Sequence, residues 1–286
     1  MIDAMRFDDY LRRIGLNGSA LPLQPTLDTL QRLHVAHRET FLFENLSIQT
    51  GGGISLALGD LERKFLDHRR GGYCFEHNLL FAAALREAGF SPTTLLGRVR
   101  RGPPERWCRT HMVLRVPVGS DLWLADVGFG ALGTLDPLPL QHGACVSQTG
   151  FEYTLRREEH LWILSMRDAA GSSQDLYEFA DDPQTPWDVE VANHFTSTHP
   201  DSVFRRTLTI QRSHRTERIV LRGEVLERYR DGRVESAPVE RAQWPRLARE
   251  LFGVELPAGP FVCDGESSLN AQLSSLKSQL TTRGEP

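Results

Sequence analysis

Cys74 is the residue in this sequence whose surroundings best suit nucleophilic chemistry. It follows two consecutive glycines, Gly71 and Gly72, and an apolar run that ends at Gly89 begins directly after it. Glycines permit a tight turn, and the apolar run predicts a helix. Cys74 is therefore expected near a helix N-terminus, where free backbone N–H groups and the helix dipole stabilise a thiolate. Taken by itself, the residue is equally well interpreted as a buried, unreactive cysteine.

Two predicted strands, 111–118 and 122–127, are joined by a predicted hairpin turn and can bring a base to a carboxylate. In the simplest register His111 lies opposite Asp126, and both side chains share one face of the hairpin. A register shifted by two residues would leave them diagonal neighbours. Either residue alone is more often structural. Together with Cys74 they predict a cysteine–histidine–aspartate triad.

The same residues also belong to pairs with zinc-ligand spacing. Cys74-x-x-His77 and Cys108-x-x-His111 would supply two thiolates and two imidazoles, a set compatible with structural zinc. Zinc would consume the predicted nucleophile and base and would leave Asp126 without a role. The sequence therefore favours the triad, with no metal.

The patterning of the chain changes at about residue 92. Residues 1–92 are helical in period and form an expected helical bundle that carries Cys74. Residues 93–190 contain short alternating runs separated by Pro and Gly, which predict an antiparallel sheet or barrel carrying His111 and Asp126. Residues 191–286 form a third expected unit, which begins with a connecting segment. The expected strands and helices outside the hairpin are 93–99, 151–156, 161–166, 207–212, 218–221 and 225–229 (strands) and 183–198 and 242–252 (helices), followed by a mobile tail over the last fifteen residues.

Composition is that of a soluble globular enzyme. Of 286 residues, 40% are hydrophobic and 24% charged, and the net charge of -4 gives no reason to expect nucleic acid or an anionic membrane as partner. The stretch 205–249 is an exception, with twelve arginines against six acidic residues. The longest apolar run, 79–85, is too short to span a bilayer, and the acidic first ten residues are unlike a secretory signal. With four cysteines and no disulfide pattern, we expect a cytoplasmic protein with reduced thiols.

Three motifs, in this order, resemble those of arylamine N-acetyltransferases. They are 70–78 (RGGYCFEHN), 110–112 (THM) and 126–130 (DVGFG), and the segments 43–46 (FENL) and 197–200 (STHP) resemble two further landmarks of the family. The matches extend from about residue 5 to about residue 205. The resemblance implies an α+β fold with an N-terminal helical bundle, a central antiparallel β-barrel and a C-terminal α/β lid, around a cysteine-protease or transglutaminase-like core.

The resemblance also implies the reaction. Acetyl-CoA would donate an acetyl group to Cys74, and an arylamine, arylhydrazine or N-hydroxyarylamine would accept it in a second step, a double displacement typical of xenobiotic metabolism. His111 would move the protons, and Asp126 would fix the imidazole tautomer. By resemblance, the residues that contact coenzyme A are Thr110, Gly128, Phe129 and Gly130. The apolar walls of the acceptor cleft are, in the same way, Phe43, Val99, Phe129 and Phe204.

Other functions compatible with these residues stay open. A macrolactam-forming amide synthase would resemble the same family closely, and a transglutaminase-like hydrolase would use the same triad. A non-catalytic binding protein is disfavoured because all three motifs are intact. The arginines of 205–249 could meet the phosphates of coenzyme A, or they could form a solvated face with ion pairs. The sequence carries no signature of an oligomeric state.

Overall fold

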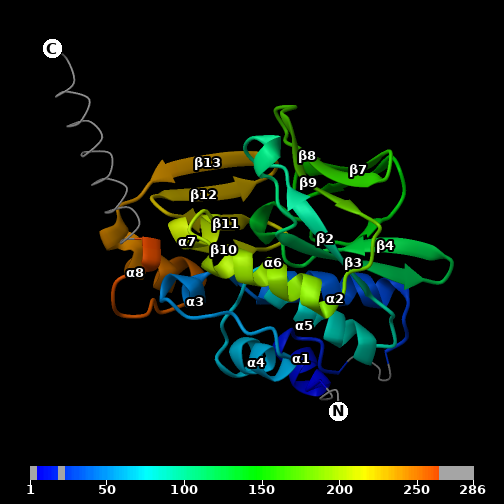
Figure 1. Cartoon of the computed structure of the whole chain (residues 1–286), viewed down its shortest axis with the longest axis horizontal. Coiled ribbons are helices and arrows are strands. Elements are labelled where there is room, and N and C mark those ends of the chain that lie inside the picture. The colour runs from blue at the N-terminus through cyan, green and yellow to red at the C-terminus, as the bar shows by residue number, and fades with distance from the viewer. Residues whose placement is uncertain (1–4, 19–22, 264–286) are drawn as a thin grey trace.

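The computed structural model describes residues 5–18 and 23–263. The expected tail lies outside these residues. The N-terminal part is helical and occupies one side of the molecule, with two sheets on the other side (Figure 1). Its helices are α1 (Phe7–Arg13), α2 (Leu27–Thr40), α3 (Leu46–Gln49), α4 (Leu58–Glu62), which continues as a π-helical turn (Arg63–Asp67), and α5 (Cys74–Glu87).

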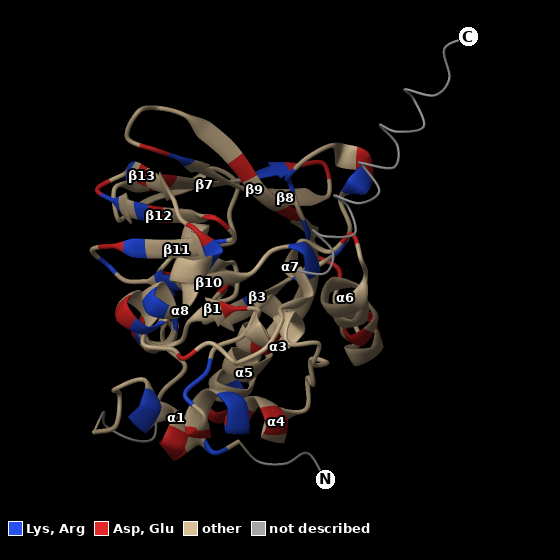
Figure 2. Ribbon diagram, turned by 90° about the vertical axis from the view of Figure 1, so that its left-hand side faces the viewer, with Lys and Arg blue, Asp and Glu red and all other residues tan. Residues whose placement is uncertain are grey.

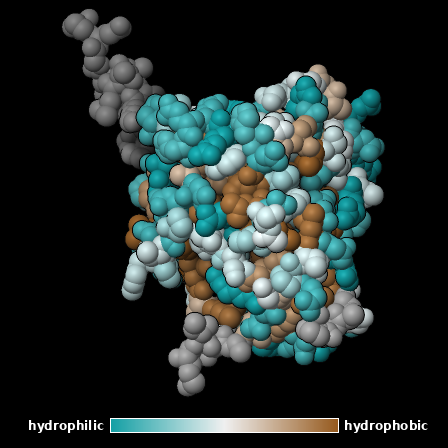
Figure 3. Space-filling model, turned by 90° about the vertical axis from the view of Figure 1, so that its right-hand side faces the viewer, coloured by the Kyte–Doolittle hydropathy of each residue, from teal (hydrophilic) through white to brown (hydrophobic). Residues whose placement is uncertain are grey.

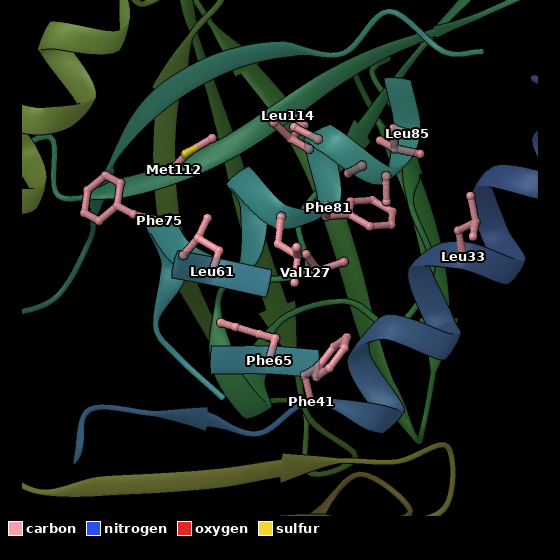
Figure 4. Packing of buried hydrophobic residues seen from close by; sticks show 14 of the residues in the cluster. Leu33, Phe41, Leu61, Phe65, Phe75, Phe81, Leu85, Met112, Leu114 and Val127 are labelled. Carbon is pink, nitrogen blue, oxygen red and sulfur yellow. The ribbon is translucent and has the colours of Figure 1, made fainter. Parts of the chain in front are cut away.

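Local signals explain where the two long helices begin. Thr26 Oγ1 accepts the Thr29 N–H at 3.3 Å and caps α2. Glu76 accepts the Tyr73 N–H at 3.0 Å at the start of α5. Both helices bury their apolar side chains in one cluster, in which aromatic and aliphatic groups from α2, the α4 region, α5 and the first barrel strands interlock (Figure 4).

An eight-stranded antiparallel sheet follows, in the order β5-β4-β3-β2-β9-β8-β7-β6. Its edge strands β5 and β6 approach each other, so the sheet is curled into a nearly closed barrel. This confirms the predicted α+β fold with an antiparallel barrel. The strands are β2 (Thr93–Val99), β3 (His111–Val118), β4 (Asp121–Ala125), β5 (Leu138–Pro139), β6 (Ala144–Gln148), β7 (Phe151–Glu158), β8 (Leu161–Arg167) and β9 (Ser173–Ala180), with 3₁₀ turns at Pro104–Arg106 and Gly130–Leu132.

The C-terminal part forms a five-stranded sheet that recruits a strand from the helical part. Its order is β1-β10-β11-β12-β13, and β1 (Phe43–Glu44) pairs with β10 through Phe43 and Gln211. The sheet thus crosses the expected boundaries at residues 92 and 190, and the division into three units stays a prediction. The remaining elements are α6 (Pro186–Thr198), α7 (Val203–Arg206), β10 (Thr209–Ser213), β11 (Arg218–Arg222), β12 (Val225–Arg230), β13 (Arg233–Pro238), a 3₁₀ turn (Arg241–Gln243), α8 (Trp244–Leu247) and a π-helical turn (Ala248–Phe252).

Basic and acidic residues are interspersed along the ribbon, including the arginine-rich C-terminal part (Figure 2). At least six arginines of 205–249 lie within 4.0 Å of a carboxylate: Arg215, Arg228, Arg230, Arg241, Arg246 and Arg249. Of the two alternatives for these arginines, the structure therefore shows the ion pairs for these six. Apolar side chains reach the surface in separate patches on the face shown in Figure 3. Over the described ranges, no helix is long and apolar enough to cross a membrane.

Candidate active site

Cys74 is the first residue of α5 and is 3% exposed. Neighbouring groups approach the backbone at the two preceding glycines so closely that a side chain there would collide with them. A Cβ on Gly71 would overlap the Leu42 carbonyl oxygen, and one on Gly72 would lie 2.5 Å from Glu76 Oε2. The tight turn predicted from the glycine pair is therefore present, and it delivers Cys74 to the helix N-terminus.

The thiol of Cys74 lies beside the first residues of β3. Its Sγ donates a hydrogen bond to the Thr110 carbonyl at 3.5 Å. Burial raises the pKa of the Cys74 thiol and the charge of Asp126 adds to the rise, whereas backbone hydrogen bonds from Met112 and Phe75 oppose it. Burial thus opposes the stabilisation that the sequence analysis expected from the helix N-terminus. Ionisation requires a neighbouring base.

His111 and Asp126 meet through the hairpin, but in a different register from the simplest one. Val118 pairs with Asp121, so the register of the hairpin is shifted by two residues from the one that places His111 directly opposite Asp126. The cause is the two-residue turn, in which Gly119 adopts a φ of 59°. The two side chains are diagonal neighbours, the alternative that the sequence left open, and His111 Nε2 lies 2.7 Å from Asp126 Oδ2.

The carboxylate of Asp126 is buried and fully hydrogen-bonded. Its Oδ1 accepts the Asn78 side-chain amide at 3.0 Å and the Gly128 N–H at 2.9 Å. Burial alone would raise the pKa of Asp126, but the charge and hydrogen bond of His111 and the bonds from Asn78 and Gly128 lower that pKa to about 2. Asp126 is therefore ionised throughout the neutral range.

Asn78 links the two sequence motifs and was assigned no role from the sequence. Besides Asp126, its amide donates to the Met112 carbonyl at 2.7 Å, and its oxygen accepts the Val127 N–H at 3.1 Å. It lies one helical turn after Cys74, and this i, i+4 spacing was the signal that could have identified it. Asn78 thus holds the turn at Asp126 to Gly128, and this turn packs directly on α5. The approach is so close that a Cβ on Gly128 would lie 2.8 Å from Cys74 Cα.

His34 of α2 supports the same turn from the other side and was also missed. Its Nδ1 lies 2.6 Å from the Leu135 carbonyl, and its Nε2 accepts the Asp126 backbone N–H at 3.1 Å. Burial, followed by the charge of Arg38, lowers the pKa of His34 to about 4. A neutral imidazole with a fixed tautomer therefore holds the backbone of Asp126.

Aromatic rings lie around these residues in two groups. On the barrel side, the Phe129 ring is 5.0 Å from the His111 ring and 4.9 Å from that of Tyr177, and Tyr177 pairs with Val99 across the sheet. A second group includes Tyr73, the residue before Cys74: the Phe204 ring is 5.4 Å from the Tyr73 ring and 5.9 Å from that of Phe43. The four apolar residues expected in the acceptor cleft thus divide between these two groups.

The glycines expected near coenzyme A are buried. Gly128 faces Cys74 and Asn78, and Gly130, with a φ of 74°, faces the Gln211 side chain. Thr110 contributes its carbonyl to the Cys74 thiol.

The pairs with zinc-ligand spacing do not converge. Cys108 is exposed, whereas His77 is buried and bonds the Leu42 carbonyl at 3.0 Å and His37 Nε2 at 2.9 Å. Across residues 5–18 and 23–263, no three His, Cys, Asp or Glu side chains are grouped to hold a metal ion.

Cys74 lies at a helix start, and His111, at the beginning of barrel strand β3, is hydrogen-bonded to a buried carboxylate. This arrangement defines a class of protein, the cysteine-triad enzymes. The sequence profile of a family described as N-acetyltransferase matches residues 26–261. This match includes all five strands of the C-terminal sheet, although the sequence analysis found no motif in the last eighty residues.

Individual relatives agree with the family match. An arylamine N-acetyltransferase of Mycolicibacterium smegmatis is 39% identical over 263 residues, 88% of this chain and 93% of the relative. An arylamine N-acetyltransferase / N-hydroxyarylamine O-acetyltransferase of Salmonella typhimurium is 40% identical over 66% of this chain and 67% of its own. The structure of the Mycobacterium marinum arylamine N-acetyltransferase in complex with CoA superposes with a TM-score of 0.80, at 33% identity, over 87% of this chain and 92% of that one. The chain belongs to the arylamine N-acetyltransferase family of acyltransferases.

Proposed function

We propose that this enzyme transfers the acetyl group of acetyl-CoA to aromatic amines, hydrazines or N-hydroxyarylamines through an acetyl-cysteine on Cys74. The observation that carries the proposal is the hydrogen bond between His111 and Asp126 beside a buried cysteine at a helix start. The names of the relatives, an arylamine N-acetyltransferase and an N-hydroxyarylamine O-acetyltransferase, support the acceptor class.

His111 is proposed as the base that ionises Cys74. Its Nε2 is committed to Asp126, and among the described residues its Nδ1 makes no hydrogen bond. Nδ1 is therefore the nitrogen that takes the thiol proton, and the ionised Asp126 supports the resulting imidazolium. The Cys74 thiolate and the His111 imidazolium form together, and their mutual attraction offsets the cost of a buried thiolate.

In the first half-reaction the Cys74 thiolate adds to the thioester carbonyl of acetyl-CoA. The bond from that carbon to the sulfur of coenzyme A breaks, the leaving thiolate takes the proton from His111, and the acetyl group stays on Cys74. In the second half-reaction the nitrogen of the amine or hydrazine, or the hydroxyl oxygen of an N-hydroxyarylamine, attacks the acetyl carbon and gives its proton to His111. The bond to Cys74 breaks, and the cysteine regains that proton.

Two aromatic groups near the triad, Phe129 with Tyr177 and Phe43 with Phe204, support an aromatic acceptor. An aromatic amine that contacts these side chains would gain ring–ring interactions that an aliphatic amine cannot make. We propose Phe43, Val99, Phe129 and Phe204 as the acceptor walls, and Thr110, Gly128, Phe129 and Gly130 as contacts of the acetyl-bearing end of coenzyme A. A reactive thiol that uses acetyl-CoA also fits the cytoplasm.

Steady-state kinetics test the proposal. Because coenzyme A leaves before the amine reacts, double-reciprocal plots at several amine concentrations should be parallel. Intersecting lines would indicate direct transfer and would contradict the acetyl-cysteine. A transglutaminase-like hydrolase would release no coenzyme A from acetyl-CoA, and an amide synthase would need an acyl-chain substrate that carries its own amine.

A further inference from the structure

Three buried polar side chains from three different helices form a chain of hydrogen bonds that takes no part in the triad. The Tyr10 hydroxyl of α1 lies 3.0 Å from His37 Nδ1 of α2, and His37 Nε2 lies 2.9 Å from His77 Nδ1 of α5. The chain ends at the Leu42 carbonyl, 3.0 Å from His77 Nε2. Tyr10 and His37 are fully buried, and His77 is 2% exposed. Buried polar groups are costly unless they are hydrogen-bonded, so this chain calls for an explanation.

The Leu42 carbonyl sets the direction of every bond in this chain. A carbonyl can only accept, so His77 Nε2 carries a proton, and in a neutral ring His77 Nδ1 must then accept. His37 Nε2 therefore donates to His77, and His37 Nδ1 accepts from the Tyr10 hydroxyl. Burial lowers the pKa of His77 to about 3 and that of His37 well below its usual value, so both rings are neutral at pH 7. Both histidines are thus held in the tautomer protonated at Nε2.

Leu42 belongs to the segment that pairs with the turn before Cys74. Its carbonyl also accepts the Gly72 N–H at 3.3 Å, and the Gly72 carbonyl accepts the Glu44 N–H at 2.8 Å. Phe43, between these residues, forms a parallel bridge with Gly72. The turn before Cys74 is therefore joined to this segment by backbone bonds that involve no imidazole.

The second contact of His77 with this segment is to the Phe43 side chain. The two rings are stacked, with centroids 6.1 Å apart and planes inclined by 11°. The Phe65 ring meets the His77 ring edge-on at 5.0 Å and restricts its rotation. Phe204 contacts the Phe43 ring at 5.9 Å. His77 thus holds residue 42 by its N–H and residue 43 by its ring.

We propose that His77 is a positioning residue that fixes the Phe43 ring, through its bond to the Leu42 carbonyl and through ring stacking, and so determines how well an aromatic acceptor binds. Tyr10 and His37 keep His77 in the tautomer that donates. This inference rests on the proposed function, in which Phe43 is a wall of the acceptor cleft. Because the acceptor reacts only in the second half-reaction, displacement of the Phe43 ring should slow that step and spare the formation of the acetyl-cysteine.

The tautomers can be tested on the parental protein without any substrate. Long-range ¹H–¹⁵N correlation spectra of protein labelled in its histidine rings report which ring nitrogen carries the proton at pH 7. Signals of His37 and His77 are assigned from their loss in His37→Gln and His77→Gln. Both rings should be protonated at Nε2 alone. A His77 ring protonated at Nδ1, or at both nitrogens, would overturn the proposal.

Kinetics of two variants test the effect on the acceptor. His77→Phe keeps a ring against Phe43 and removes the donor, whereas His77→Gln places an amide N–H where Nε2 lies. In a double displacement, kcat/KM for the amine reports the second half-reaction and kcat/KM for acetyl-CoA reports the first. In His77→Phe, kcat/KM for an arylamine should fall roughly three- to tenfold, as expected for the loss of one hydrogen bond. For acetyl-CoA it should stay within about twofold, and His77→Gln should recover most of the loss for the amine.

His160→Phe is the matched control, because that side chain is 74% exposed on a hairpin turn, and both ratios should stay at the parental values. Equal losses in both ratios of a folded His77→Phe protein, or a loss that His77→Gln does not recover, would contradict the positioning of Phe43. A parental enzyme that releases no coenzyme A would instead contradict the proposed function and leave the tautomers as they are. The spectra of the parental protein stay decisive if His77→Phe does not fold.

Discussion

Replacing Asp126 with asparagine should nearly abolish acetyl transfer for a reason that the hydrogen bonds around it define. Oδ1 already accepts two donors, from Asn78 and Gly128, and Oδ2 faces His111. In Asp126→Asn the amide oxygen will keep the Oδ1 position, because an NH₂ group there would face two donors. The amide nitrogen then points at His111 Nε2, at the 2.7 Å separation of the parent pair.

That arrangement selects the wrong imidazole tautomer. An NH₂ group at this position obliges Nε2 to accept, so the proton of a neutral imidazole moves to Nδ1, the nitrogen that must take the Cys74 proton. The imidazolium also loses its counter-charge. The corresponding change in a serine triad costs about 10⁴ in kcat, or roughly 5.5 kcal/mol in activation free energy, and we expect a loss of this size here.

The assay is the initial rate of coenzyme A release with a saturating arylamine. Thermal melting of the variant shows whether the fold is kept. Asp136→Asn is a matched control, since that half-buried carboxyl contacts neither His111 nor Cys74 and should keep activity near the parent. A folded Asp126→Asn protein within about tenfold of parental activity would refute the tautomer argument and would reduce Asp126 to a turn residue.

Two further predictions concern stability and packing. The pKa values of His34 (about 4), His37 (well below 6.5) and His77 (about 3) are all lowered, first of all by burial. Since only the unfolded chain takes up these protons below about pH 6.5, stability should fall on acidification, by roughly 3 to 6 kcal/mol between pH 7 and pH 5 in urea titrations; a flat profile would contradict neutral buried imidazoles. Gly128→Ala should cost about 1 to 3 kcal/mol and at least tenfold in activity, because its Cβ would press on Asn78 and the α5 backbone. Gly59→Ala, with open space around its Cβ, should be neutral in thermal melting and in activity, and parental activity in Gly128→Ala would show that the contact is not needed.

Elements with strong patterns could be predicted from the sequence. The strands expected at 93–99 and 111–118 coincide with β2 and β3, and α5 begins at Cys74. Their sequences are alternating or continuously apolar because one or both faces of each strand or helix are buried. The 242–252 helix is also present, although it is broken into a 3₁₀ turn, α8 and a π-helical turn before Gly253.

Elements that lack an apolar pattern, or that are held by long-range pairing, could not be predicted in this way. Every residue of β13 is exposed, so the strand has no buried face to show in its sequence. β1 is two residues long and exists because it pairs with β10, far along the chain. β9 begins with polar residues and was missed as well, and with it the contact between Tyr177 and His111.

In the candidate site, too, the residues in sequence motifs could be predicted and the residues that support them could not. Cys74, His111 and Asp126 stand in recognisable motifs, and the structure brings His111 to Asp126 and the Cys74 thiol to Thr110 beside them. The residues that hold the site, such as His34 and His37, come from α2, and no local spacing relates them to Asp126 or to His77. Their roles depend on tertiary packing alone.

The most direct test of the proposed function is the mass of the protein after mixing with acetyl-CoA in the absence of any amine. An acetyl-cysteine intermediate predicts one added acetyl group per chain, located on the Cys74 peptide, with one equivalent of coenzyme A released. Addition of an arylamine should then remove the acetyl group and return the parental mass. An unmodified protein, or an acetyl group on another residue that the amine does not remove, would contradict Cys74 as the carrier.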